Sequence, residues 1–174
     1  MAQNYKSILK NIKTLIFDID GVFTDNRVIL FPGMEPVRTF SARDGYALHY
    51  AIKKGLQIVI ITGGKSDSVV ERLTEMGVEN IYSGIKNKEK KLKEFIAETN
   101  SNIEEILYMG DDIPDLRVML MVGLACCPQD AVNEVKSICN YISPVKGGQG
   151  CVRDIIEQTL KVQGKWMDED AHEW

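Results

Sequence analysis

Short apolar runs that alternate with longer amphipathic stretches constrain the fold of this chain more than any other feature. The apolar runs are nearly continuous, as in parallel strands that are covered on both faces. They lie at residues 15–17, 56–61, 81–82, 106–109, 124–126 and 141–142. Helical periodicity occurs near residues 45–54, 67–76, 86–99, 113–121, 130–138 and 151–163. Strands and helices in this order predict an α/β fold with a doubly wound parallel sheet.

Two segments depart from this alternation. Between Asp25 and Asp44, the stretches RVILF and PVRTF flank a Pro-Gly turn, which predicts a β-hairpin flap over residues 26–41. The acidic residues 165–174 have no helical period but include Trp166 and Trp174, so we expect either a frayed tail or a docked one. We therefore expect one domain over residues 1–164, with the flap and without a separate cap domain, followed by the tail.

Composition argues against several classes of function. A net charge of −4 and an isoelectric point near 5.3 disfavour a nucleic-acid or anionic-membrane partner. No apolar run approaches the roughly 20 residues that span a membrane. The N-terminal apolar stretch is interrupted by Lys13 and is a poor signal peptide. We therefore expect no membrane partner, no nucleic acid and a cytoplasmic location.

The cysteines and histidines do not form a recognisable site. Four cysteines lack zinc-knuckle spacing and are expected to be reduced, buried thiols: Cys126, Cys127, Cys139 and Cys151. Because His49 and His172 are the only histidines, we expect no histidine-based metal cluster or catalytic triad. The chemistry must then rest on carboxylates, lysines and hydroxyls.

An acidic pair follows the first predicted strand, in the sequence FDIDGVFTD. Side chains repeat every two residues along a strand, so we expect Asp18 and Asp20 on one face at its carboxyl end, where open α/β sheets bind ligands. Two carboxylates this close repel each other unless a cation or a shared proton intervenes, which favours a hard divalent metal. The alternative is an Asp-rich turn that serves only to cap the backbone.

A second acidic group follows the apolar run at 106–109, in the sequence GDDIPD. It places Asp111, Asp112 and Asp115 at the same predicted edge of the sheet. Acidic residues also suit the start of a helix. Two acidic groups that converge in an acidic protein would be costly without a metal, however, so we expect a cation between them.

Two further motifs suit an anion. Thr62, Gly63 and Gly64 follow the run at 56–61 and offer a hydroxyl and backbone N–H groups at a helix start, which suits a phosphate. Lys88 follows the next short strand and could bring positive charge to the same edge. Taken singly, Lys88 also fits a solvated helix charge.

The ordered set DxDGxxTD, TGG, Gly-x-x-x-Lys and GDDxxD resembles the haloacid dehalogenase superfamily of phosphatases. The resemblance implies a Rossmann-like core in which Asp18 is the nucleophile and Asp20 the general acid/base, with Thr62 and Lys88 holding the phosphoryl group. An aspartate at position 18 favours a phosphatase over a dehalogenase, because Asp20 can protonate an alkoxide leaving group. The resemblance also implies Mg²⁺ as cofactor, bound by Asp18, Asp20 and Asp111 with support from Asp112 and Asp115.

The capless form with a flap is similar to the 3-deoxy-D-manno-octulosonate 8-phosphate (KDO 8-phosphate) phosphatase family over nearly the whole chain, including the stretches FSARDGY and GGQGCVRD. The resemblance implies a cytoplasmic homotetramer in lipopolysaccharide precursor synthesis, in which a neighbouring subunit closes each site and the tail can fold over it. The substrate would be a sugar-acid phosphate. Its expected binding residues are Ser41, Ala42, Arg43, Asp44, Gly45, Gly63, Gly64, Lys65 and Arg72.

Two positions depart from that family's pattern. The family usually has an arginine directly after the Thr-Gly pair, where this chain has Gly64 followed by Lys65, and another arginine where His49 stands. Nine-carbon 2-keto-3-deoxy acid 9-phosphates, of the KDN or sialic acid type, are therefore alternative substrates, although Arg43 beside Asp44 favours the eight-carbon one. A non-catalytic regulatory protein on the same fold is a further alternative, but such a chain would be expected to lose a catalytic aspartate.

Overall fold

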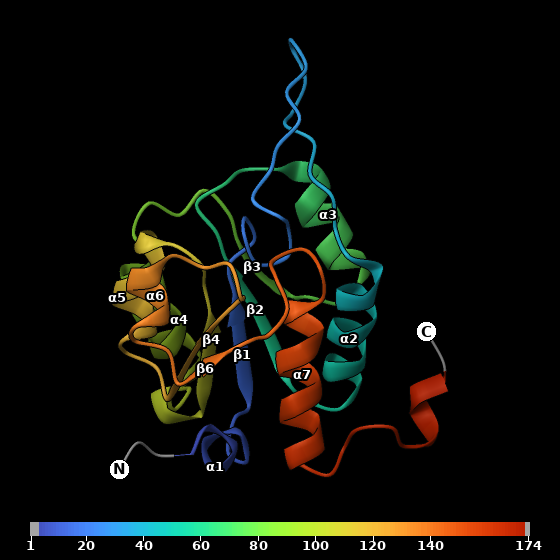
Figure 1. Cartoon of the computed structure of the whole chain (residues 1–174), viewed down its shortest axis with the longest axis vertical. Helices are drawn as coiled ribbons and strands as arrows, with labels where there is room; N and C mark the ends of the chain where they lie inside the picture. Colours follow the sequence, from blue (N-terminus) through green and yellow to red (C-terminus); the bar gives the residue numbers. More distant parts are fainter. Residues whose placement is uncertain (1–3, 173–174) are drawn as a thin grey trace.

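Six parallel strands form the central sheet of the computed structural model, which describes residues 4–172 (Figure 1). The strands are β1 (Thr14–Phe17), β2 (Gln57–Ile61), β3 (Asn80–Tyr82), β4 (Ile106–Met109), β5 (Leu124–Cys127) and β6 (Tyr141–Ile142). Their order is β3-β2-β1-β4-β5-β6, so β1 pairs with both β2 and β4. The strand order reverses beside β1, and the crevice at the carboxyl ends of β1 and β4 is the usual ligand site of such a sheet.

Helices cover both faces of this sheet. They are α1 (Tyr5–Leu9), α2 (Ala42–Lys53), α3 (Asp67–Glu75), α4 (Lys88–Thr99), α5 (Leu116–Met119), α6 (Asn133–Lys136) and α7 (Cys151–Val162), with short 3₁₀ turns η1 (Ile103–Glu105), η2 (Ile113–Asp115) and η3 (Glu169–His172). One buried core packs α1, α2, α3 and α7 on one face, and a second packs α4, α5 and α6 on the other (Figure 1). The predicted doubly wound α/β sheet is confirmed.

The predicted strands agree with the structure to within a residue or two, whereas the ends of the helices differ more. Helix α2 begins at Ala42 rather than near residue 45, because Ser41 caps it by accepting a hydrogen bond from the N–H of Asp44. The helix expected at 113–121 is divided into η2 and α5, with Pro114 in the first turn. Only four residues of the stretch at 130–138 form α6.

The flap projects beyond the carboxyl edge of the sheet (Figure 1). Instead of two regular strands it contains one antiparallel bridge, in which Ile29 and Val37 exchange two backbone hydrogen bonds of 3.1 and 3.0 Å. Apolar side chains are exposed along it: Val28, Ile29, Leu30, Phe31, Met34 and Val37. A two-stranded ribbon without a packing partner gains little from longer pairing.

The tail from residue 165 to residue 172 lies against α2. The Trp166 ring meets the Tyr50 ring edge-on at 5.5 Å, and the Tyr50 hydroxyl donates to Asp168 Oδ1 at 2.7 Å. Of the two expected arrangements, the docked one is observed for these residues, while Trp174 lies outside the described part of the chain. Between residues 4 and 172, no helix combines the length and apolar character that crossing a membrane requires.

Candidate active site

A polar hollow of about 170 Å³ opens at the carboxyl ends of β1, β2 and β4. It is lined by Asp18, Asp20, Asn26, Thr62, Gly63, Gly64, Lys88, Asp111, Asp112, Pro114 and Asp115. Strand β1 ends immediately before Asp18 and β2 immediately before Thr62. Side chains from four predicted motifs therefore meet at one edge, because the carboxyl ends of parallel strands share that edge.

Three buried carboxylates form the centre of the hollow. Asp18, Asp111 and Asp115 each place one oxygen within 4.8 Å of the other two. Burial and the neighbouring Asp115 raise the pKa of Asp18 to about 6, and burial with Asp18 and Asp115 raises the pKa of Asp111 to about 8. Among the described residues, the buried Oδ1 of Asp18 has no hydrogen-bond partner. A hard divalent cation fits this oxygen-rich cluster, because it would relieve the repulsion and engage the orphaned oxygen.

Lys88 is the one lysine in this lining, and it holds two of the three acids together. As the first residue of α4, after the Asn87 cap, its Nζ lies 2.9 Å from Asp18 Oδ2 and 2.7 Å from Asp115 Oδ1. Burial opposes the charged form, but Asp115 and Asp18 outweigh it and raise the pKa of Lys88 above its usual value. Lys88 is thus a buried cation at the site and not a solvated helix charge.

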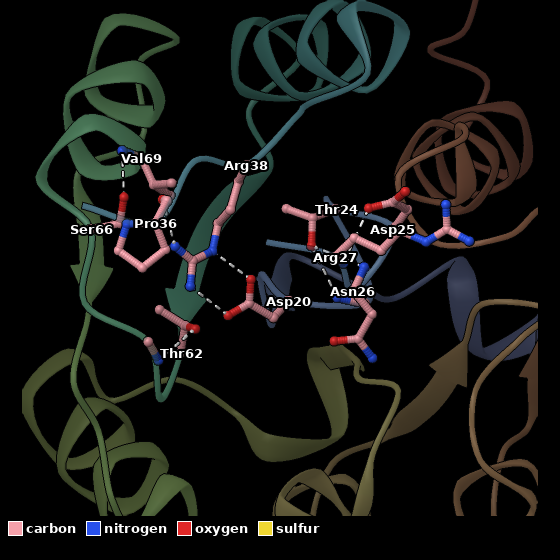
Figure 2. A network of polar contacts seen from close by, with 12 residues as sticks. Asp20, Thr24, Asp25, Asn26, Arg27, Pro36, Arg38, Thr62, Ser66 and Val69 are labelled. Atoms are coloured by element: carbon pink, nitrogen blue, oxygen red, sulfur yellow. Dashed lines mark hydrogen bonds and ion pairs between the residues drawn. The ribbon is translucent and has the colours of Figure 1, made fainter. Parts of the chain in front are cut away.

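Asp20 lines the hollow but is not part of the acid cluster. Its Oδ1 and Oδ2 accept hydrogen bonds from Nε and Nη2 of Arg38, at 2.7 and 3.1 Å (Figure 2). The expectation that Asp18 and Asp20 share one face assumed an extended chain, whereas β1 ends at Phe17 and residues 19–24 form a turn. The geometry therefore does not support the predicted side-chain metal ligand at Asp20.

Thr62, Gly63 and Gly64 form the wall expected to hold a phosphate. The backbone N–H of Thr62 donates to the carbonyl oxygen of Tyr82 at 2.9 Å, which attaches the start of this loop to β3. Thr62 Oγ1 is buried and accepts a hydrogen bond from the N–H of Gly64 at 3.3 Å. Lys65 is exposed and does not line the hollow, because its side chain passes Gly84 instead.

The remaining predicted substrate residues lie outside the hollow of their own chain. Ser41 caps α2, Ala42 and Arg43 are exposed, and Gly45 is buried. Arg43 borders a separate hollow of about 410 Å³, together with Gln149 and Arg153. None of residues 41–45 lines the hollow between the strand ends, since this segment forms the cap and the first turn of α2.

Three acidic or basic residues have local structural contacts that their motifs did not indicate. Asp44 is buried and accepts the N–H of Arg153 at 2.7 Å, and burial raises its pKa to about 6. Arg72 is exposed on α3 and pairs with Glu75 at 3.2 Å. Asp112 lies at the rim, exposed, with its carboxylate accepting the N–H of Ile113 at 2.8 Å.

Three residues outside the sequence motifs contact the site acids. Arg38 contacts Asp20, Asn26 Nδ2 donates to Asp111 Oδ2 at 3.1 Å, and the hydroxyl of Tyr108 donates to Asp115 at 2.8 Å. A charged residue inside an apolar hairpin strand was the available signal for Arg38. Asn26 has a φ of 64°, a left-handed conformation that asparagine tolerates better than most residues, so its residue type was the only indication in the sequence. Nothing in the apolar run around Tyr108 marked it.

The sequence of the chain is similar to those of known hydrolases. Residues 74–155 match the haloacid dehalogenase-like hydrolase family. The chain is 33% identical to the KDO 8-phosphate phosphatase KdsC of Escherichia coli strain K12 over 160 residues, which cover 92% of this chain and 85% of the relative.

Solved structures resemble the whole fold. The KDO 8-phosphate phosphatase of Yersinia pestis superposes with a TM-score of 0.91 at 31% identity, covering 95% of this chain and 89% of that one. The enzyme of Moraxella catarrhalis, solved with magnesium, phosphate and KDO, superposes with a TM-score of 0.89 at 28% identity and 92% coverage of both chains. The chain belongs to the 3-deoxy-D-manno-octulosonate 8-phosphate phosphatase family of haloacid dehalogenase-like hydrolases.

Proposed function

We propose that this protein is a Mg²⁺-dependent phosphatase that releases KDO and phosphate from KDO 8-phosphate, in lipopolysaccharide precursor synthesis. The observation that carries the proposal is Asp18, a buried carboxylate with one unpartnered oxygen that lies beside Lys88 and across from Thr62 in one hollow. Family membership and the KDO, phosphate and magnesium held by the Moraxella relative support the substrate and the cofactor. Residues 1–164 would form the single catalytic domain.

The reaction uses Asp18 and Asp20 in two steps. In the first, a carboxylate oxygen of Asp18 bonds to phosphorus, the bond between phosphorus and the sugar oxygen breaks, and Asp20 gives that oxygen a proton. In the second, Asp20 takes a proton from water, the water oxygen bonds to phosphorus, and the acyl phosphate bond to Asp18 breaks. Lys88, Thr62 and the N–H groups after it bind the phosphoryl oxygens throughout.

Asp18 and Asp111 are the residues that would hold Mg²⁺, with Asp115 in support. When bound, the cation neutralises charge on the phosphoryl oxygens and lets a carboxylate approach them. Asp115 already bonds to Lys88 and Tyr108, so its contribution is to orient the lysine as well as to add negative charge.

Phosphate release from purified protein tests the proposal. Asp18→Asn should abolish turnover of KDO 8-phosphate, while the exposed, matched Asp67→Asn on α3 should leave it unchanged. Residual turnover above about 1% in Asp18→Asn would contradict the nucleophile assignment. A panel of eight-carbon and nine-carbon keto-acid phosphates then decides the substrate, and faster turnover of the nine-carbon compounds would replace KDO 8-phosphate with the alternative.

We also propose the homotetramer, in which a neighbouring copy covers the flap and closes the site. Supporting it are the apolar residues exposed on the flap and the position of Arg43 and Arg72 outside the hollow of their own chain. Light scattering should give a tetramer, and Leu30→Asp on the flap should reduce its mass. The equally exposed Leu120→Asp at the end of α5 is the control, and an unchanged mass in Leu30→Asp would argue against a flap interface.

The cytoplasmic location remains a proposal too. Cys126, Cys127 and Cys151 are buried, and all four cysteines are free thiols, which suits a reducing compartment. Fractionation of cells that produce the tagged protein would test it, and recovery in a periplasmic fraction would contradict it.

A further inference from the structure

Arg38 inverts the usual distribution of polar and apolar side chains in the flap. Its side chain is 10% exposed, whereas the apolar Val37 beside it is 41% exposed. Removing a guanidinium from water is costly unless a fixed partner compensates it. The flap therefore directs one charged side chain inward, and the residue it contacts is Asp20.

The contact has the geometry of a clamp. Nε and Nη2 of Arg38 reach one oxygen each of Asp20, at 2.7 and 3.1 Å, and Nη1 donates to the carbonyl oxygen of Pro36 at 3.3 Å (Figure 2). Three of the guanidinium nitrogens are thus held, two by the carboxylate and one by the flap itself. Such a two-point pair fixes the plane of the carboxylate.

Gly64 leaves the space that this clamp needs. A Cβ at this position would lie 3.2 Å from Asp20 Oδ2 and 3.4 Å from Arg38 Nη2, so a side chain would press on both partners. Glycine at position 64 therefore leaves Arg38 free to reach Asp20, and alanine there would crowd the pair.

We propose that Arg38 is a positioning residue that orients the carboxyl group of Asp20 as the base for hydrolysis of the aspartyl-phosphate. The inference rests on the proposed phosphatase function. Each oxygen of Asp20 that accepts a hydrogen bond from Arg38 keeps a second lone pair, which can accept a proton from water. The arrangement thus favours the second step, in which water loses its proton to Asp20, the water oxygen bonds to phosphorus and the bond to Asp18 breaks.

An aryl phosphate separates the two steps. The p-nitrophenolate leaving group departs without a proton, so the first step with p-nitrophenyl phosphate does not need Asp20 as an acid. General acid–base catalysis contributes about 10²- to 10⁴-fold, and a displaced base forfeits part of it, so Arg38→Ala should lower steady-state turnover about 10- to 100-fold. Stopped-flow absorbance should show a burst of p-nitrophenol close to one per subunit, and acid quenching should trap phosphorylated protein.

Matched variants separate positioning from folding. Arg38→Lys keeps the charge but offers one contact point, so it should recover part of the second step. Gly64→Ala crowds the same pair and should also accumulate phosphorylated protein, which tests the idea even where Arg38→Ala unfolds. Arg27→Ala removes an exposed arginine from the same flap and should behave like the wild type.

Several outcomes would overturn the inference. Equal slowing of both steps without trapped phosphoenzyme would reduce Arg38 to a structural role. A higher KM with unchanged kcat would make it a substrate contact instead. If the wild type forms neither p-nitrophenol nor phosphoenzyme, the proposed phosphatase function is wrong. If the wild type turns over but the Arg38→Ala variant shows no burst, only the role proposed for Arg38 is wrong.

Discussion

Replacement of Lys88 by methionine tests whether the site is an electrostatic unit. Lys88 is the buried cation between Asp18 and Asp115, at 2.9 and 2.7 Å, with only 6% of its side chain exposed. Lys88→Met keeps most of the volume of the side chain but leaves these two carboxylates facing each other beside Asp111. Breaking a buried ion pair from one side costs about 3–5 kcal/mol, because the remaining charges are uncompensated.

The same helix supplies the control. Lys93 pairs with Glu89 at 2.6 Å one turn away, but its side chain is 61% exposed. Exposed pairs of this spacing contribute about 0.3–0.5 kcal/mol, so Lys93→Met should lower the free energy of unfolding by no more than that. A short distance alone does not make an ion pair strong. Burial makes the difference between the two lysines, and the predicted ratio of their effects is about tenfold.

Urea unfolding at pH 7.5 in EDTA, followed by circular dichroism, measures the free energy of unfolding of both variants without bound metal. Thermal unfolding in the same buffer gives their melting temperatures. For a domain of this size 1 kcal/mol shifts the melting temperature by about 2–4 °C, so Lys88→Met should melt about 6–20 °C lower and Lys93→Met within about 2 °C of the wild type. The reasoning would be refuted if the two variants lost the same free energy of unfolding. It would then follow that the acids rearrange or take up protons at little cost.

Two further predictions concern residues away from the reacting groups. The pKa of Asp44 is about 6 in the folded protein, above its usual 3.8, so the folded state binds a proton more tightly than the unfolded state. Protonation of Asp44 therefore stabilises the fold at low pH, and this stabilisation is lost as the pH rises from about 4 through 6. Asp44→Asn should remove that loss, so the difference in unfolding free energy between wild type and variant should change by about 2 kcal/mol from pH 4.5 to pH 7. A difference that does not depend on pH would contradict this expectation. At Gly147 a Cβ would lie 2.0 Å from the carbonyl oxygen of Gly21, so Gly147→Ala should lower the melting temperature by several degrees and reduce turnover by displacing the loop after β1. A Cβ at Gly33 would meet nothing within 4 Å beyond its neighbours in the chain, so alanine there meets only the strain of a φ of 72° and should cost about 1 kcal/mol. Equal effects at the two glycines would refute the steric argument.

The sheet could be predicted closely because its signal is local and strong. Each buried strand is a short apolar run, and covering on both faces leaves no polar alternation to mislead the assignment. The order of the motifs along the chain then brought Asp18, Thr62, Lys88 and Asp111 to one edge, since parallel strands present their carboxyl ends together. Helix ends were less predictable, because capping by Ser41 and the turn at Pro114 depend on single residues.

The contacts between distant segments could not be predicted from the sequence. Arg38 reaches Asp20 because the hairpin turns back over the strand ends, and Asn26 reaches Asp111 across 85 positions of sequence. Neither contact has a periodicity or spacing that announces it. The reverse holds for Arg72, whose motif position suggested a substrate contact although its side chain pairs with Glu75 on the surface. A motif identifies the strand end, and the packing of the flap and helices decides which side chains reach it.

The charge of the hollow implies an order of binding. Five aspartates and Lys88 line it, a formal charge of −4. Arg38 beside Asp20 and the proton that Asp111 keeps at neutral pH, because its pKa is about 8, reduce this charge to about −2. A phosphate dianion meets repulsion of about 8 kcal/mol for each carboxylate that remains unscreened at 4 Å, because each of its two charges contributes about 4 kcal/mol, so we expect the metal to bind before the phosphate. Calorimetry should therefore detect phosphate binding with Mg²⁺ present and none in EDTA. Asp18→Asn, which removes a charge that is present at pH 7.5, should restore weak phosphate binding in EDTA. Phosphate that binds the wild type equally in both buffers would show that Lys88 and the loop after Thr62 suffice without a cation.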